Sequence, residues 1–298
     1  MATDSTTIES GISQRWDLSD EELANYPTVY KEDSLAGKTV LVSGGGTGIG
    51  RGISYLMARC GAKVIICSRN QDNLDGTING VKKHLDKMIH SYIINIREPE
   101  NVAAMMQAIW DEHGGIDILV NNSGGQFPQD AIDFSVNGWN AVIDLNLNGT
   151  WYMMQQAAQR WRKHKRAGNI VNIIANVRRG MPQVAHTAAA RSGVLALTRS
   201  VATEWAEYDI RVNCLAPGSI ASNGLEVYSE EVQNNFIKSN PMMKTGDVCD
   251  VAEGAIYLAS NAGKFITGTE LTVDGGMQHW GNAWPGGVPD RFKHIYID

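Results

Sequence analysis

The sequence is poor in proline, cysteine and charge, and it has no long apolar run. Its 298 residues include 8 prolines and 4 cysteines, and 19% of them are charged. The cysteines form no CxxC pair and stand at no metal-ligand spacing from a histidine, so we expect buried thiols and no bound metal. No apolar run approaches the ~18 residues of a membrane span, and the first residues lack a basic-then-apolar signal pattern. These absences predict a cytoplasmic protein without a membrane span.

Acidic residues outnumber basic ones, 32 to 26, which gives a formal net charge of −6 at pH 7. This balance argues against sequence-independent binding to nucleic acid or to an anionic membrane. Glycine contributes 31 residues, above the usual share of ~7%, and hydrophobic residues make up 43% of the chain. The composition is typical of a well-packed α/β domain with glycine-rich turns.

Short β-branched runs alternate with amphipathic segments from Lys38 onward. Strands that are buried on both faces and followed by helices indicate a doubly wound parallel sheet. We expect one α/β domain of this Rossmann type over residues 36–298, with a short N-terminal extension (1–35) before it and a C-terminal tail. The expected strands are Thr39–Ser43, Lys63–Cys67, His90–Ile94, Ile118–Asn121, Asn169–Ile174, Arg211–Leu215 and Glu270–Val273. The expected helices include Ile49–Cys60, Glu100–Glu112, Asn137–Trp161 and Arg191–Tyr208.

The N-terminal extension is mostly polar and acidic. Within it, Ser19 and Glu22 form the capping-box pattern of a short helix. We expect the extension to pack as an arm, on the domain itself or on a neighbouring subunit.

A glycine cluster follows the first expected strand. It runs Ser43-Gly44-Gly45-Gly46-Thr47-Gly48-Ile49-Gly50, and a helix is expected directly after it. Glycines let the backbone turn sharply and approach a pyrophosphate, whose charge the helix N-terminus attracts. Any tight turn can use such residues, but the strand–turn–helix context favours a dinucleotide cofactor.

The end of the second expected strand bears on which dinucleotide is bound. An NAD-binding site usually places a carboxylate here for the adenine ribose, whereas this chain has Ser68 and Arg69. Because arginine binds phosphate through charge-assisted, bidentate hydrogen bonds, this pair favours NADP(H). Asp72 stands close enough in the sequence to keep NAD as the alternative.

A series of motifs resembles the short-chain dehydrogenase/reductase family, over Leu35 to Gly276. They are Ser43-Gly44 with Gly48-Ile49-Gly50, then Asn121-Asn122-Ser123-Gly124, Asn146-Leu147-Asn148-Gly149, Pro217-Gly218 and Val273-Asp274-Gly275-Gly276. Further stretches are similar to the NADPH-dependent trans-2-enoyl-CoA and 2,4-dienoyl-CoA reductase branch. These stretches are Cys67-Ser68-Arg69-Asn70, Asn95-Ile96-Arg97, Gly124-Gly125-Gln126-Phe127, Leu147-Asn148-Gly149-Thr150 and His186-Thr187-Ala188-Ala189-Ala190-Arg191.

The resemblance implies a cofactor site at the carboxyl edge of the sheet, a substrate-covering segment at 219–245, and a homodimer or homotetramer. In this family the helix expected at Arg191–Tyr208 commonly forms the dimer face. The implied cofactor-binding residues are Ser43, Gly44, Gly46, Thr47, Gly48, Ile49, Ser68, Arg69, Asn95, Ile96, Asn122, Ser123, Gly124, Arg191, Pro217, Gly218, Ser219 and Ile220.

The resemblance also implies an active site whose usual residues are replaced. The family's serine position falls on Ile174 or Ala175, its tyrosine position on Thr187 and its lysine position on Arg191. A threonine hydroxyl is far too weak an acid to protonate an alkoxide as it forms, which disfavours ordinary alcohol–ketone chemistry.

Hydride addition to an α,β-unsaturated thioester requires less of the protein, because hydrogen-bond donors can stabilise the resulting enolate. The candidate catalytic residues are Asn146, Asn176 and Thr187 as donors, and Arg191 as a cation. Asn146 could instead bond to backbone between helix and sheet, Asn176 could be a turn residue, and Thr187 could simply pack. His186 titrates near neutrality but diverges from Thr187 by about 100° around the helix.

The sequence therefore favours an NADP(H)-dependent oxidoreductase that reduces an activated C=C bond in a small-molecule substrate, with an acyl-CoA as one candidate. Two alternatives stay open. One is a carbonyl reductase or alcohol dehydrogenase with an atypical proton donor. The other is a nucleotide-binding member of the fold without redox chemistry.

Overall fold

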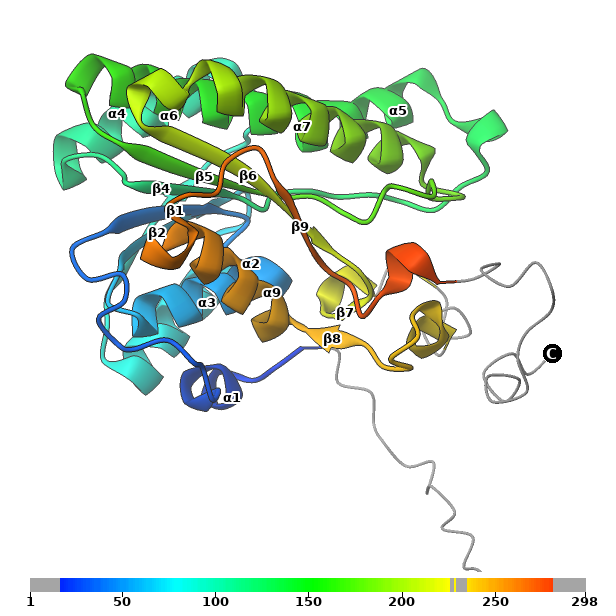
Figure 1. Cartoon of the computed structure of the whole chain (residues 1–298), viewed down its shortest axis with the longest axis horizontal. Coiled ribbons are helices and arrows are strands. Elements are labelled where there is room, and N and C mark those ends of the chain that lie inside the picture. Colours follow the sequence, from blue (N-terminus) through cyan, green and yellow to red (C-terminus); the bar gives the residue numbers. More distant parts are fainter. Residues whose placement is uncertain (1–16, 226–227, 229–234, 281–298) are drawn as a thin grey trace, which may run out of the picture.

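The computed structural model describes residues 17–225, 228 and 235–280. At its centre lies a parallel sheet of seven strands, in the order β3-β2-β1-β4-β5-β6-β9 (Figure 1). The order reverses between β1 and β4, and ligands of such sheets bind at the carboxyl edge beside the reversal. The predicted doubly wound α/β fold is confirmed. Its strands are β1 (Thr39–Ser43), β2 (Lys63–Ser68), β3 (Ile89–Ile93), β4 (Ile118–Asn121), β5 (Gly168–Ile173), β6 (Ile210–Pro217) and β9 (Glu270–Val273).

Helices cover both faces of the sheet (Figure 1). One face carries α4 (Pro99–His113), α5 (Val136–Ile143), α6 (Gly149–His164) and α7 (Ala185–Glu204). The other face carries α2 (Gly48–Arg59), α3 (Gln71–Leu85) and α9 (Val248–Ala259). Shorter elements are α1 (Asp20–Asn25), β7 (Ile220–Ala221), β8 (Gly246–Asp247) and 3-10 turns at Ala131–Asp133, Ala206–Tyr208, Asn223–Leu225, Phe236–Ser239, Asn261–Gly263 and Met277–His279.

Two expected helices differ from the structure in ways that matter for the site. The helix expected at Asn137–Trp161 contains a π-helical turn at Asp144–Asn148, between α5 and α6. The helix expected at Arg191–Tyr208 instead begins at Ala185, without a side-chain cap that the sequence could have signalled. Its earlier start puts Thr187 and Arg191 one turn apart on the same face of α7.

Alternate residues of the central strands face two separate hydrophobic layers. Val40 and Val42 of β1 pack in the layer beneath α2 and α9, and Leu41 packs in the layer beneath α4 and α6. All three are fully buried. Burial on both faces explains why these strands are runs of apolar residues rather than alternating patterns.

The described part of the N-terminal extension packs on its own domain. The capping box of Ser19 and Glu22 opens α1, as expected. Asp20 of α1 accepts hydrogen bonds from the Arg51 guanidinium and the Tyr55 hydroxyl of α2, and Leu23 is fully buried. Residues 1–16 and the expected C-terminal tail beyond 280 lie outside the described residues.

No helix within the described ranges is long and apolar enough to cross a bilayer. The same ranges hold no group of three or more histidine, cysteine, aspartate or glutamate side chains suited to a metal ion. The four cysteines are buried free thiols, as expected. On α7, Val194 and Val201 are buried within their own chain, so the dimer face expected on this helix stays a prediction.

Candidate active site

The glycine-rich turn after β1 leaves space that side chains would fill. Gly44 has a φ of +67°, a conformation that glycine adopts readily. A Cβ on Gly50 would lie 2.1 Å from the Gly44 carbonyl oxygen, and a Cβ on Gly45 would lie 2.5 Å from Ile66 Cγ2. Because α2 begins within this turn, its first N–H groups lack helical partners and are suited to an anion. The turn therefore fits the pyrophosphate of a dinucleotide.

A cavity of about 580 Å³ opens beside this turn, at the carboxyl edge of the sheet. The residues predicted at the cofactor that line it are Gly44, Thr47, Ser68, Arg69, Ile96, Asn122, Ser123 and Gly124. The cavity is also lined by residues that the sequence analysis did not single out for this site, namely Asn70, Asn73, Ile94 and Leu145.

The charge in this cavity favours a phosphate group. Arg69 is an exposed cation at its edge, beside Ser68, and the described residues that line it include no carboxylate. Asp72, the alternative NAD-type carboxylate, lies on α3 and is not among the lining residues. The Ser68 hydroxyl donates a 3.1 Å hydrogen bond to the Asn70 carbonyl oxygen, which fixes the turn that carries Arg69.

The other residues expected at the cofactor support this cavity or lie beside it. Ser43 is buried, and its Oγ accepts hydrogen bonds from the backbone N–H groups of Asn122 and Ser123, each at 3.1 Å. Asn95 Oδ1 accepts a 3.3 Å bond from the Arg97 N–H in the turn after β3. Gly46, Gly48 and Ile49 belong to the glycine-rich turn and the first turn of α2. The end of β6 and the start of β7 contribute Pro217, Gly218, Ser219 and Ile220, the last two of which line a separate cavity of about 340 Å³.

The side chain of Asn146 forms hydrogen bonds to the backbone of one residue, Gly125. Asn146 is 1% exposed and lies in the π-helical turn. Its Nδ2 donates to the Gly125 carbonyl oxygen and its Oδ1 accepts from the Gly125 N–H, both at 3.0 Å. This pair of bonds holds the loop after β4 against the start of α6.

Arg191 places a buried cation directly behind the same loop. Its Nη2 donates to the Ser123 carbonyl oxygen at 3.4 Å, and a Cβ on Gly124 would lie 2.0 Å from that nitrogen. Nη1 is buried, and within the described ranges it has neither a hydrogen-bond acceptor nor a carboxylate partner. Burial lowers the pKa of the guanidinium to about 10, so the group is charged at neutral pH. An unpaired buried cation is costly, and its position suits negative charge on a bound molecule.

Thr187 and His186 lie one turn before Arg191 at the start of α7, and both are buried. His186 Nδ1 accepts a 2.8 Å bond from the Thr187 N–H and lies 3.3 Å from Thr187 Oγ1. The imidazole stacks on Phe134 at a centroid distance of 4.5 Å and meets Phe127 edge-on at 4.7 Å. Burial lowers the pKa of His186, partly offset by the carbonyls of Val184 and Phe127, so the ring is neutral near pH 7.

A neutral, buried His186 predicts a loss of stability in acid. Its pKa in the folded protein lies below the ordinary 6.5, so the unfolded chain binds a proton first as the pH falls. This contribution is complete above pH 6.5 and is lost as the pH drops through the lowered pKa. Urea unfolding at pH 7 and pH 5 should show a larger drop in the free energy of unfolding for the native protein than for His186→Phe. Equal drops would contradict this assignment.

Asn176 joins the carboxyl ends of three strands. Its Nδ2 donates to Asp274 Oδ2 at 2.8 Å, and its backbone N–H donates to the Pro217 carbonyl oxygen at 3.2 Å. Asp274 is 9% exposed and also accepts from the N–H groups of Gly276 and Gln278, each at 2.8 Å. The structure thus places Asn176 in a network that fixes the turn after β9.

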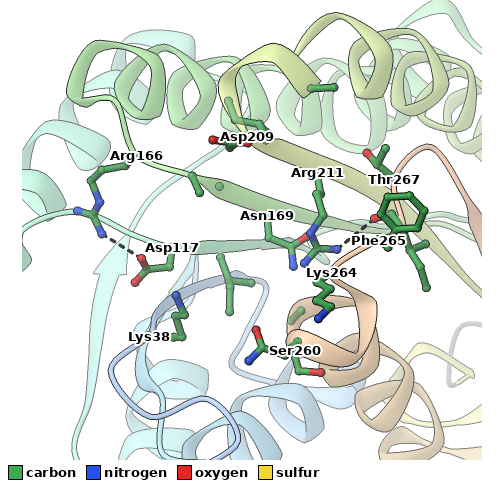
Figure 2. A pocket seen from close by; sticks show the side chains of 18 residues that line it. Lys38, Asp117, Arg166, Asn169, Asp209, Arg211, Ser260, Lys264, Phe265 and Thr267 are labelled. Atoms are coloured by element: carbon green, nitrogen blue, oxygen red, sulfur yellow. Dashed lines mark hydrogen bonds and ion pairs between the residues drawn. The ribbon is translucent and has the colours of Figure 1, made fainter.

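Another cavity, of about 830 Å³, lies at the opposite, amino edge of the sheet (Figure 2). Figure 2 shows Arg166 turned toward Asp117, and these side chains form a 3.1 Å ion pair. Arg211 donates a 2.7 Å bond to the Gly263 carbonyl oxygen. Since none of the predicted site residues lines this cavity, the carboxyl-edge cavity is the better candidate for the active site.

Comparisons with known proteins agree with this fold. Residues 44–278 match a family model described as enoyl-(acyl carrier protein) reductase. The chain is 34% identical over 260 residues to the peroxisomal 2,4-dienoyl-CoA reductase of Arabidopsis thaliana, covering 83% of this chain and 87% of the relative. It is also 34% identical over 244 residues to the 3-oxoacyl-[acyl-carrier-protein] reductase of Chlamydia muridarum, covering 82% of this chain and 98% of the relative.

Solved structures extend the likeness. A short chain dehydrogenase from Bacillus anthracis aligns with a TM-score of 0.74 and 36% identity, covering 82% of this chain and 98% of that one. A protein from Agrobacterium tumefaciens, solved with bound NADP, aligns with a TM-score of 0.77 and 31% identity, covering 84% and 99%. The fold is that of a family of oxidoreductases that bind nicotinamide cofactors. The chain belongs to the short-chain dehydrogenase/reductase family, as its sequence motifs predicted.

Proposed function

We propose that the protein is an NADP(H)-dependent reductase of activated C=C bonds, with an enoyl thioester such as an acyl-CoA as its small-molecule substrate. The observation that carries this proposal is the buried guanidinium of Arg191 behind the cofactor cavity, which has no carboxylate partner among the described residues. Helix α7 holds no tyrosine and no lysine, so it offers a cation without the acid that ketone reduction uses. This arrangement suits a reaction in which a cation stabilises negative charge on the substrate oxygen and no acid protonates that oxygen at once.

The preference for NADP(H) rests on Ser68, Arg69 and the absence of a carboxylate among the described cavity residues. Arg69 would bind the 2′-phosphate that distinguishes NADP from NAD. The glycine-rich turn would bind the pyrophosphate, with Asn122, Ser123 and Gly124 along the nicotinamide half of the cavity. The reduced cofactor, when bound, supplies a hydride.

Four residues of this chain would organise the substrate. Arg191 would stabilise the negative charge that develops on the thioester oxygen, and the Thr187 hydroxyl one turn earlier would donate a hydrogen bond to it. Asn146 would act by positioning, because it fixes Gly125 through two hydrogen bonds. Asn176 would act in the same way, through Asp274 and the turn after β9.

Reduction of a carbonyl is the second candidate, because the Chlamydia relative is named as a 3-oxoacyl reductase. In that reaction the proton donor would have to come from outside α7. A nucleotide-binding role without redox chemistry is the third, and it would leave Arg191 without catalytic use. A cytoplasmic location and a homodimer or homotetramer form part of the proposal, on family analogy.

The proposal is tested by following NADPH absorbance with purified protein, a trans-2-enoyl-CoA and a 3-oxoacyl-CoA of the same chain length. Oxidation with the enoyl-CoA, faster with NADPH than with NADH, is the expected result. Oxidation with the 3-oxoacyl-CoA only would replace this proposal by carbonyl reduction. NADPH binding without oxidation in either assay would favour the role without redox chemistry.

A further inference from the structure

The amino-edge cavity of about 830 Å³ extends across four neighbouring strands of the sheet. Lys38 precedes β1, Asp117 precedes β4, and Asn169 and Arg211 belong to β5 and β6. Because neighbouring strands lie about 4.8 Å apart, this row of residues spans about 14 Å. The amino-edge cavity and the cofactor cavity have no lining residue in common. A ligand bound here would therefore leave the proposed active site open.

Hydrogen bonds fix the wall of this cavity at its β6 end. Asn169 and Arg211 are directly paired across β5 and β6. Arg211 Nη1 donates to the carbonyl oxygens of Gly263 and Ile266 at 2.7 and 3.1 Å, which holds the loop between α9 and β9 against the sheet. Asn169 Nδ2 donates a 2.9 Å bond to the Leu258 carbonyl oxygen in the last turn of α9. The wall is therefore formed before any ligand binds.

The cavity carries an excess of positive charge, although the whole chain has a formal net charge of −6. Its basic lining residues are Lys38, Arg166, Arg211 and Lys264, and its acidic ones are Asp117 and Asp209. Asp117 is already paired with Arg166. Among the described residues, neither Lys38 nor Lys264 forms an ion pair, and Arg211 has no carboxylate partner. These three cations are available to an anionic ligand.

An aromatic ring stands at the same end of the cavity as two of these cations. Phe265 follows Lys264 in the loop between α9 and β9, lines the cavity and is 100% exposed. Figure 2 shows Phe265, Lys264 and Arg211 at one end of the cavity and Lys38 at the other. A basic groove with an exposed aromatic ring is the combination on which proteins stack a base while they bind its phosphates.

We propose that the amino-edge cavity is a second ligand site, which binds a nucleotide. The base stacks on Phe265, the phosphate groups lie against Lys264 and Arg211, and the row of strand ends leads them toward Lys38. This binding involves no chemical step and does not depend on the proposed reduction of an enoyl thioester. An aromatic base that carries phosphates is common to free nucleotides and to coenzyme A, so the test includes both.

Calorimetry of the full chain with ADP tests the cation and the ring separately. Lys264→Glu should weaken the binding of both ADP and inorganic pyrophosphate by about 10-fold, because it replaces attraction by repulsion. Phe265→Ala should weaken ADP by about 10-fold and leave pyrophosphate unchanged, since it removes only the stacking partner. Lys83→Glu, an exposed charge reversal outside this cavity, is the control and should bind ADP like the native protein. Arg211 is kept, because it holds the loop.

Photolabelling with 8-azido-ADP, followed by peptide mapping, places the probe on the chain. We expect label on the peptide that contains residues 260–268, and its loss in Lys264→Glu. Label confined to the glycine-rich turn after β1 would overturn the inference, and so would equal ADP binding by the native protein, Lys264→Glu and Phe265→Ala. Coenzyme A as competitor identifies the source. Displacement of the label at 260–268 by less coenzyme A than ADP would support the site with coenzyme A as its ligand, and the reverse order would support it with a free nucleotide.

Discussion

Replacing Arg191 by methionine is expected to lower kcat for enoyl-CoA reduction by about 10³-fold and, at the same time, to raise Tm by about 2–5 °C. The rate should fall because the buried cation behind the loop that lines the cofactor cavity is removed. Stability rises because the guanidinium is 8% exposed and has no carboxylate partner within the described ranges, so a methionine of similar length avoids a buried charge. Steady-state kinetics and thermal unfolding of the same preparation would measure both effects.

Two further variants show whether the charge or its position matters. Arg191→Lys keeps a cation and should retain more activity than Arg191→Met. In Gly124→Ala the added Cβ would lie 2.0 Å from the present position of Arg191 Nη2, so this variant should displace the guanidinium. Its kcat should fall as in Arg191→Met, but without the gain in Tm, since the buried charge remains. Wild-type kcat in Arg191→Met would remove this residue from the chemistry.

The combination of lost activity and gained stability would distinguish a functional arginine from a structural one. A structural arginine with satisfied bonds lowers stability when it is removed, as Arg211 should, given its bonds to the carbonyls of Gly263 and Ile266. Removal of Arg191 should instead raise stability, because its Nη1 lacks a described acceptor. Uncompensated charge of this kind persists in folded proteins where a ligand or transition state uses it.

The sheet and the glycine-rich turn were predictable because their signals are local. The β1–α2 connection carries its glycines close together, and β1 is a short apolar run followed directly by this turn and a helix. The start of α7 was not predictable in the same way, since Val184 provides no side-chain cap. A helix without a capping residue has no sequence signal at its first turn.

The partners of the candidate polar residues could not be predicted from sequence. Asn176 bonds to Asp274, 98 positions away, and Gln126 bonds to Tyr228, 102 positions away. Such pairs form only after the carboxyl ends of separate strands come together, so residue type and spacing give no sign of them. For Asn146 the sequence left backbone bonding and site chemistry open, and the π-helical turn adds a position that helical periodicity does not anticipate.

Charge reversal at Arg69 is expected to change the cofactor preference by about 1,000-fold. Arg69→Glu would remove a charge-assisted contact to the 2′-phosphate and add repulsion by a like charge, each costing a few kcal/mol, or about 3 orders of magnitude together. The ratio of kcat/KM for NADPH to that for NADH should fall by this amount, mostly through the KM for NADPH. The use of NADH should change little, because its ribose has no phosphate at this position.

Lys83→Glu is the matched control, because it reverses an exposed charge on α3, the helix that follows Arg69, outside the cavity. It should leave the ratio unchanged, which would show that the effect of Arg69→Glu is local rather than a result of net charge. Asp72→Asn separates the remaining alternative: if Asp72 bound the ribose of NAD, this variant would impair NADH use. An unchanged preference in Arg69→Glu, together with a loss of NADH use in Asp72→Asn, would show that the protein uses NAD. Asp72, and not Arg69, would then be the residue that contacts the adenine ribose.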